Sequence, residues 1–217
     1  MLGLGAPRVQ ERTLLIFLIR HGETPGNAAR IVQRPDIPLS PRGVVQAERL
    51  ARRLEGKGIG GILSSDLARA VTTALYLQRT TGVQLAFDPL LQERNFGDVR
   101  GTPYADLGFD LFAPDYAPPS GETWDVFHAR VDRAWALMRR VAAATEGHLA
   151  VVTHGLVCRS LATRHLRLPA GQEAPERWEN TAVTIVEAEA PWQVLLLNSI
   201  AHLDDIDSLP LPHSGPA

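Results

Sequence analysis

A run of six apolar residues, Leu14 to Ile19, ends abruptly in Arg20-His21-Gly22. Uninterrupted apolar runs of this length are typical of strands that are buried on both faces of a parallel sheet. Ligands of open α/β sheets bind just beyond the carboxyl ends of such strands. A guanidinium and an imidazole at that point favour an anionic ligand, phosphate first, and Gly22 would let the backbone approach it closely.

A second apolar run, Leu149 to Thr153, leads in the same way into His154-Gly155. The segment from Leu156 to Leu166 then predicts a helix that ends before Pro169. Two separate strands therefore each deliver a His-Gly pair to the same edge of the sheet. This repetition favours a functional role for both histidines over a purely structural one.

Apolar strands alternate with amphipathic helices along most of the chain. The pattern predicts an α/β fold of three layers, α/β/α, with a mostly parallel sheet. Ser40 before Pro41 signals the start of one helix, and we expect the segment Ser64-Ser65-Asp66 to cap the next. The runs 182–187 and 192–197 predict a closing hairpin, an antiparallel element at or near a sheet edge.

Residues 96–121 mix Gly, Pro, Asp and Tyr without periodicity. A loop of this length within a compact domain is usually functional, so we expect a lid over a site. Residues 1–12 read as a loose leader and residues 208–217 as a flexible tail. The length and the lack of an internal linker predict a single domain over residues 1–217.

Composition excludes several classes of protein. A formal net charge of −2 gives no reason to expect nucleic acid as a partner, and no apolar stretch approaches the length of a membrane span. Cys158 is the only cysteine, which fits a reducing compartment. Residues 1–6 lack the features of a secretory signal, so we expect a cytoplasmic protein.

A metal site is the main alternative for the histidines. His154 and Cys158 stand four residues apart on one predicted helix, and His21 could be a third zinc ligand. Cys158 has apolar neighbours, however, which favours a buried structural thiol. The acidic run 204–207 is interpreted as a solvated charge cluster. We therefore predict neither a metal nor a cofactor.

Four motifs together resemble those of the histidine phosphatase superfamily, the group related to cofactor-dependent phosphoglycerate mutase. They occur in the order expected for that superfamily. The segment 120–123 also resembles the broad-specificity phosphatases of the group. The motifs are Arg20-His21-Gly22-Glu23-Thr24 with Asn27, the run Ser64 to Ala70, Glu93 within Leu91 to Gly97, and Thr153-His154-Gly155.

The resemblance implies a phosphohistidine mechanism. His21 would attack phosphorus through a neutral ring nitrogen, while a backbone carbonyl near Gly22 holds the other nitrogen. Arg20 and Arg69 would bind the phosphoryl oxygens with planar guanidinium forks and disfavour the charged imidazole. Arg69 is expected roughly opposite the buried stripe of its helix, which comprises Leu67, Val71, Ala74, Leu75 and the stem of Gln78. His154 would donate to the oxygens as charge develops on them.

Glu93 would be the general acid that protonates the leaving group, which requires a raised pKa. Thr24, Asn27 and Gly155 would line the phosphate pocket. Glu122 would close the lid side of the pocket, although a carboxylate at a helix N-terminus also has a sufficient structural reason to be there.

The expected function is a metal-independent phosphomonoesterase that hydrolyses a small phosphorylated metabolite. Phosphoglycerate mutase is the alternative, and a non-catalytic phosphate-binding module is a second one. A bisphosphate cofactor needs a second cluster of cations, whereas the lid contains only Arg100. The lid is also shorter than the mutase insertion, and Pro25-Gly26 stands where mutases often carry a tryptophan. These departures favour the phosphatase.

Arg100 departs from the phosphatase pattern too, because many such relatives carry an acidic residue there. It could favour a substrate with a second anionic group, or it could face solvent. The lid aromatics could contact a leaving group or form a small lid core, and we favour the core. A homodimer is possible through the edge of the closing hairpin. The aromatics are Phe96, Tyr104, Phe109, Phe112 and Tyr116.

Overall fold

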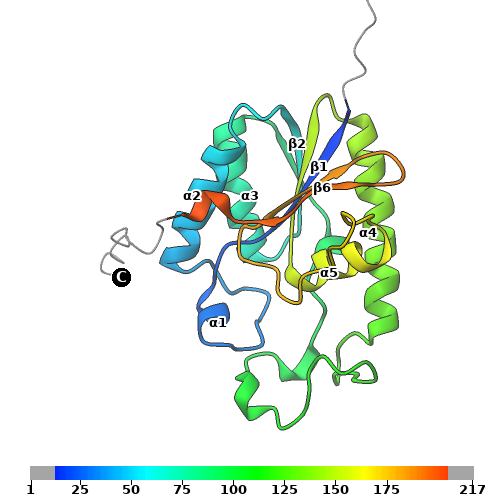
Figure 1. The fold of residues 1–217 in the computed structure, drawn as a ribbon. Helices are drawn as coiled ribbons and strands as arrows, with labels where there is room; N and C mark the ends of the chain where they lie inside the picture. The colour runs from blue at the N-terminus through cyan, green and yellow to red at the C-terminus, as the bar shows by residue number, and fades with distance from the viewer. Residues whose placement is uncertain (1–12, 205–217) are drawn as a thin grey trace, which may run out of the picture.

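Six strands form one mixed sheet in the order β3-β2-β4-β1-β5-β6 (Figure 1). The computed structural model describes residues 13–204, so the predicted leader and tail lie outside the described residues. Strands β1 to β4 run parallel to one another, and β5 is antiparallel to β1. The strands are β1 (Leu15–Arg20), β2 (Ile59–Ser64), β3 (Gln84–Phe87), β4 (His148–Thr153), β5 (Val183–Glu187) and β6 (Val194–Ser199).

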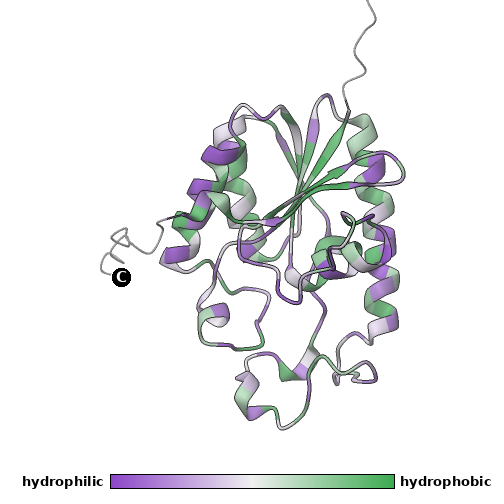
Figure 2. Cartoon of the chain, in the orientation of Figure 1, coloured by the Kyte–Doolittle hydropathy of each residue, from purple (hydrophilic) through white to green (hydrophobic). Residues whose placement is uncertain are grey.

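Helices cover both faces of this sheet, which confirms the predicted three-layer fold. Along β1 the side chains alternate: Phe17 and Ile19 pack under α2 and α3, whereas Ile16 and Leu18 pack under α4 and α5. Figure 2 shows the apolar residues concentrated along the strands between these layers. The helices are α1 (Pro25–Ala28), α2 (Pro41–Leu54), α3 (Ala68–Thr81), α4 (Trp124–Ala144) and α5 (Gly155–Arg164), with short 3-10 turns η1 (Pro89–Leu91), η2 (Gly97–Val99), η3 (Tyr104–Asp106) and η4 (Ala201–Leu203).

The two strands that precede the His-Gly pairs are direct neighbours. β1 and β4 are parallel, and their register sets Arg20 opposite Thr153. The pairing continues one residue further, because the His21 N–H donates to the Thr153 carbonyl at 3.0 Å. His21 and His154 therefore leave the sheet side by side, as predicted.

The closing hairpin is confirmed at one edge of the sheet, where β6 pairs antiparallel with β5. Residues 96–121 contain two 3-10 turns but no α-helix and no β-strand, as the lack of periodicity predicted. In Figure 1 this segment lies beyond the carboxyl ends of β1 and β4. None of the helices within residues 13–204 is long and apolar enough to cross a membrane.

The start of α3 differs from its prediction. Leu67 is the N-cap, and no side chain caps the helix. The Ser65 hydroxyl instead accepts from the Leu67 N–H at 3.3 Å and contacts a histidine of the site. The buried face is also rotated: Arg69 lies on it and is 3% exposed, rather than opposite it. Of the expected stripe, Leu67 and Ala74 are buried, whereas Val71, Leu75 and Gln78 are half-buried.

Gly22 serves close packing between backbones rather than close approach to a ligand. A Cβ on Gly22 would lie 2.7 Å from the Gly43 carbonyl oxygen, and one on Gly43 would clash with the Glu23 carbonyl. The predicted cap at Ser40 is confirmed, since its hydroxyl accepts from the Gly43 N–H at 3.0 Å. That hydroxyl also donates to the Glu23 carboxylate at 2.8 Å. The start of α2 therefore fixes the segment that carries His21.

We expect Gly43→Ala to lower the free energy of unfolding by about 1–3 kcal/mol, because the new methyl group must displace the Glu23 backbone. Arg52→Ala, at an exposed position on the same helix, is the control and should change stability by less than about 0.5 kcal/mol. Denaturant unfolding measures both. Equal stabilities for the two variants would show that the contact between α2 and this segment is not tight.

Candidate active site

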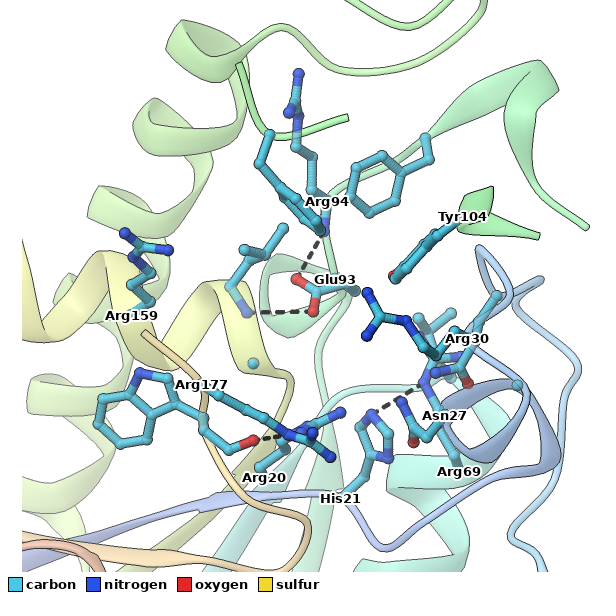
Figure 3. Close-up of a pocket in the computed structure, with 18 of the residues that line it drawn as sticks. Arg20, His21, Asn27, Arg30, Arg69, Glu93, Arg94, Tyr104, Arg159 and Arg177 are labelled. Carbon is cyan, nitrogen blue, oxygen red and sulfur yellow. Dashed lines mark hydrogen bonds between the residues drawn. The ribbon is translucent and has the colours of Figure 1, made fainter. Parts of the chain in front are cut away.

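A cavity of about 350 Å³ lies at the carboxyl ends of β1 and β4 (Figure 3). Its base holds the residues that follow these two strands, and its far wall comes from the lid. Its lining is strongly cationic, with only two carboxylates, Glu93 and Glu176. The arginines that line it are Arg20, Arg30, Arg69, Arg94, Arg100, Arg159 and Arg177.

His21 is 2% exposed, and both of its ring nitrogens have partners. Nδ1 lies 2.7 Å from the Gly22 carbonyl oxygen, which can only accept, so we assign the ring proton to Nδ1. The Arg69 Nε–H donates to Nε2 at 3.2 Å. The Nε2 lone pair is therefore directed toward a guanidinium in the pocket, and the predicted carbonyl partner near Gly22 is present.

The electrostatic surroundings keep the His21 ring uncharged. Burial lowers the pKa of His21 well below its usual value, and the positive charges of Arg69 and Arg20 lower it further. The hydrogen bond to the Gly22 carbonyl acts in the opposite direction but is the smallest of these effects. A neutral imidazole with a fixed proton is suited to nucleophilic attack through Nε2.

The guanidinium groups of Arg20 and Arg69 have N–H donors that no hydrogen bond within residues 13–204 uses. One guanidinium nitrogen of Arg20 donates to the Trp178 carbonyl, whereas Arg20 Nε is buried without a partner among residues 13–204. Arg69 donates to the Arg34 carbonyl at 3.2 Å as well as to the histidine. Burial lowers the pKa of Arg69 to about 10, so it remains charged at neutral pH. Two buried cations facing one cavity favour an anionic ligand.

His154 lies directly beside the first histidine, with ring centroids 5.0 Å apart. Its Nε2 is 2.8 Å from the Ser65 hydroxyl, which has no other acceptor for its proton among residues 13–204, so we assign this hydroxyl as the donor to Nε2. The ring proton then belongs on Nδ1, which is buried without a partner in the described chain. Burial, Arg69 and His21, in that order, lower the pKa of His154 well below its usual value. His154 is fully buried and does not itself line the cavity, so its unused Nδ1–H lies behind the lining, beside His21.

Glu93 lines the pocket and points into it (Figure 3). Its Oε1 accepts from the Arg94 N–H at 3.0 Å, and its Oε2 accepts from the Leu156 N–H at 3.2 Å. Burial raises the pKa of Glu93, and these two hydrogen bonds and the nearby arginines only partly oppose the rise. The shift favours the protonated carboxyl, which is the form that a general acid requires.

Thr24 does not line the pocket, contrary to expectation. It is fully buried because its hydroxyl caps α1, where it accepts from the Asn27 N–H at 3.0 Å and donates to Gln33 at 2.8 Å. Asn27 does line the pocket. Its Oδ1 accepts from the Thr24 N–H at 3.2 Å and from Asn180 at 3.3 Å, which leaves its Nδ2 as a donor toward the cavity.

Asn180 is a residue of the site that sequence reasoning missed. It is buried, and its amide also donates to the His21 carbonyl at 3.0 Å. Asn180 thus holds both the nucleophile's backbone and the Asn27 amide in place. It precedes β5 and is 159 residues away from His21 in the chain, so no local pattern marked it.

Gly155 and Arg100 both line the pocket. A Cβ on Gly155 would lie 3.6 Å from Arg20 Nε, so this glycine leaves room beside the buried donor. Arg100 is half-buried at the cavity rather than turned to solvent. The lid does contain only Arg100, but Arg30, Arg159 and Arg177 line the same cavity from outside the lid, so the count of lid cations understates the positive charge of the cavity.

Glu122 does not close the pocket. It is bound to Arg130 of α4 at 2.7 Å and lies outside the cavity lining. The small lid core predicted for the lid aromatics is present. Phe96, Tyr104 and Tyr116 belong to a small apolar cluster around Leu111, and Phe109 stacks on Tyr116 with centroids 4.7 Å apart. Three of the rings also line the cavity, namely Phe96, Tyr104 and Phe112.

The arrangement of side chains does not favour the zinc alternative. Cys158 is fully buried, and burial raises the pKa of its thiol, which disfavours the thiolate form that zinc binds. Within residues 13–204, no three His, Cys, Asp or Glu side chains are grouped so that they could hold a metal ion. Of the acidic run 204–207, only Asp204 is described.

The chain is similar to several known proteins in sequence and in fold. A probable phosphoglycerate mutase GpmB of Proteus mirabilis (strain HI4320) is 31% identical over 209 residues, covering 89% of this chain and 96% of that protein. A putative α-ribazole-5′-P phosphatase from Escherichia coli K-12 has a TM-score of 0.75 at 27% identity, covering 88% of this chain and 98% of that one. For mycobacterial glucosyl-3-phosphoglycerate phosphatase the TM-score is 0.72 at 26% identity, covering 87% and 100%.

The family model described as histidine phosphatase superfamily (branch 1) matches residues 16–199, which include every predicted site residue. Those relatives carry the names of both phosphatases and mutases. Their names therefore do not decide between the two activities. The match over residues 16–199 shows that the chain belongs to the histidine phosphatase superfamily, branch 1.

Proposed function

We propose that the chain is a metal-independent phosphomonoesterase that hydrolyses a small phosphorylated metabolite through a phosphohistidine at His21. The observation that carries the proposal is the state of the His21 ring. Its proton is fixed on Nδ1 by the Gly22 carbonyl, and its Nε2 lone pair meets a guanidinium at a cationic cavity. A phosphomonoester, with about two negative charges near neutral pH, matches that cavity.

The phosphoryl group would be bound by the hydrogen-bond donors that have no partner in the part of the chain that the structure describes. The phosphoryl oxygens would accept from Arg20 Nε, the Asn27 amide and His154 Nδ1. Arg69 would turn its Nε–H from the His21 ring to an incoming oxygen, which frees the Nε2 lone pair. Because these donors are preorganised and largely buried, they act more strongly on developing charge than they would in water.

The chemical step would then split into two displacements. His21 Nε2 bonds to phosphorus as the ester P–O bond breaks, and Glu93 gives its proton to the departing oxygen. Water next attacks the phosphohistidine, Glu93 takes the water proton, and phosphate leaves with His21 regenerated. The Gly22 carbonyl accepts from Nδ1–H throughout and stabilises the positive charge that the ring gains.

Phosphoglycerate mutase is a second candidate because a relative 31% identical to this chain bears that name. The arginines of the pocket outside the lid remove one argument against it. In a mutase the phosphoryl group would pass from His21 to a second hydroxyl rather than to water. Interconversion of phosphoglycerates with a bisphosphate primer, faster than phosphate release, would favour this candidate. The cytoplasmic location and a possible homodimer stay predictions.

We expect His21→Ala to abolish phosphate release from p-nitrophenyl phosphate, since His21 is the only imidazole that lines the cavity within residues 13–204. The parent should turn over in excess chelator, because guanidinium groups rather than a metal supply the positive charge. His128→Ala is the matched control, a histidine outside the pocket lining, and should stay active. Phosphate release by all three proteins, with and without chelator, is the measurement. Loss of the parent's activity in chelator would mean that a metal takes part.

The loss of kcat in Glu93→Gln should depend on the leaving group of the substrate. An alkyl phosphate needs a proton on its departing oxygen, so its kcat should fall by about 10²–10⁴-fold. p-Nitrophenyl phosphate has a good leaving group and should lose much less. Steady-state kinetics with the two substrates gives the comparison. A loss of equal size for both would argue against general-acid catalysis by Glu93.

The pH profile should be highest on the acid side. His21 must be neutral, and its lowered pKa keeps it so well below its usual value of 6.5. Glu93 must be protonated, and its raised pKa extends that state above its usual value of 4.5, so activity declines as pH rises through the raised pKa. Glu93→Gln should lose this alkaline decline. A decline that persists unchanged in the variant would assign it to another group.

A further inference from the structure

Arg130 of α4 contacts the backbone around the proposed general acid from outside the pocket. One of its terminal nitrogens donates to the carbonyl oxygens of Leu90 at 2.9 Å and Gln92 at 2.7 Å. The other donates to the carbonyl of Glu93 itself at 3.3 Å. A single guanidinium thus donates hydrogen bonds to three carbonyl oxygens within four consecutive residues.

The charge of Arg130 is neutralised by Glu122. The carboxylate binds the guanidinium through two hydrogen bonds of 2.7 Å each, a bidentate arrangement. The two side chains are only 12% and 14% exposed. Burial alone would raise the pKa of Glu122, but hydrogen bonds from Arg130 and the Asn95 N–H hold it below its usual value. Glu122 is therefore a charged partner in a largely buried pair.

Glu122 also binds the chain on the other side of the acid. Its carboxylate accepts from the Asn95 N–H at 2.8 Å, and its own N–H donates to the Asn95 carbonyl at 2.8 Å. Its carbonyl accepts from Arg94 Nε at 3.0 Å. Arg130 before Glu93 and Glu122 after it therefore hold the segment 90–95 from both sides.

This support matters because Glu93 lies between η1 and η2, outside any strand or long helix. Its carboxyl is held by two backbone N–H groups and by no side chain within residues 13–204. The direction of the carboxyl therefore depends on the backbone of its own segment and on the start of α5. Losing the contacts that fix that backbone would move the acid relative to the leaving group, and displacements of about 1 Å can reduce rates about 100-fold.

We propose that Arg130 and Glu122 form a positioning pair that sets the Glu93 carboxyl for proton transfer. Neither residue lines the cavity, so the pair acts through Glu93 and touches no substrate. The inference rests on the acid role proposed for Glu93. Because Glu122 directly follows the lid segment 96–121, the same pair joins the end of the lid to the acid.

The test compares an alkyl phosphate with p-nitrophenyl phosphate in Arg130→Gln, Glu122→Gln and Glu93→Gln. The readout is the ratio of kcat for the alkyl ester to kcat for the aryl ester. In Arg130→Gln we expect this ratio to fall about tenfold or more, in the same direction as in Glu93→Gln but by less. Arg164→Gln is the matched control. It breaks an exposed arginine–carboxylate pair with Asp132, 2.9 Å apart and away from the pocket, and should leave the ratio unchanged.

Equal losses for both substrates in Arg130→Gln and Glu122→Gln would overturn the proposal, since a merely structural pair lowers all activities alike. If Arg130→Gln does not fold, the ratio in Glu122→Gln decides in the same way. Failure of both variants to fold would make the pair structural and also overturn the proposal. Equal losses in Glu93→Gln would instead refute the acid role on which the inference rests.

Discussion

The parallel pairing of β1 with β4 is the constraint on which the site depends. Its register brings Arg20 opposite Thr153, so the two chain segments that leave the sheet carry His21 and His154 in contact. Helices packed on both faces fix this pairing in place. The close approach of Gly22 to the start of α2 then fixes the path of the chain after β1.

The electrostatics of the cavity follow from this arrangement. Burial first and the facing arginines second lower the pKa of both histidines, so the imidazoles stay neutral while the cations keep their charge. The carboxyl of Glu93 is shifted the other way, toward its protonated form, because burial disfavours its charge. A neutral imidazole, fixed cations and a carboxyl shifted toward its protonated form are the states that the proposed phosphoryl transfer requires. One cavity therefore provides each group in the form it needs.

Local patterns predicted what is encoded locally. The apolar run before His21 marked that histidine directly. Glu93 lies in a polar loop with no local signal of its own, and only the resemblance to the superfamily motif pointed to it. Contacts between distant segments could not be predicted in this way. Asn180 and Arg130 reach the site through hydrogen bonds to backbone carbonyls, which leave no signature in residue type or spacing. Thr24 was misplaced because a hydroxyl that caps a short helix and one that lines a pocket look alike in a sequence.

The most direct test of this account is to trap the phosphoenzyme. Rapid quenching with a ³²P-labelled substrate, followed by peptide mapping, shows which side chain carries the phosphoryl group. The account predicts a label that is stable in base, labile in acid and located on His21. Turnover without any trapped label, or a label on another residue, would contradict it.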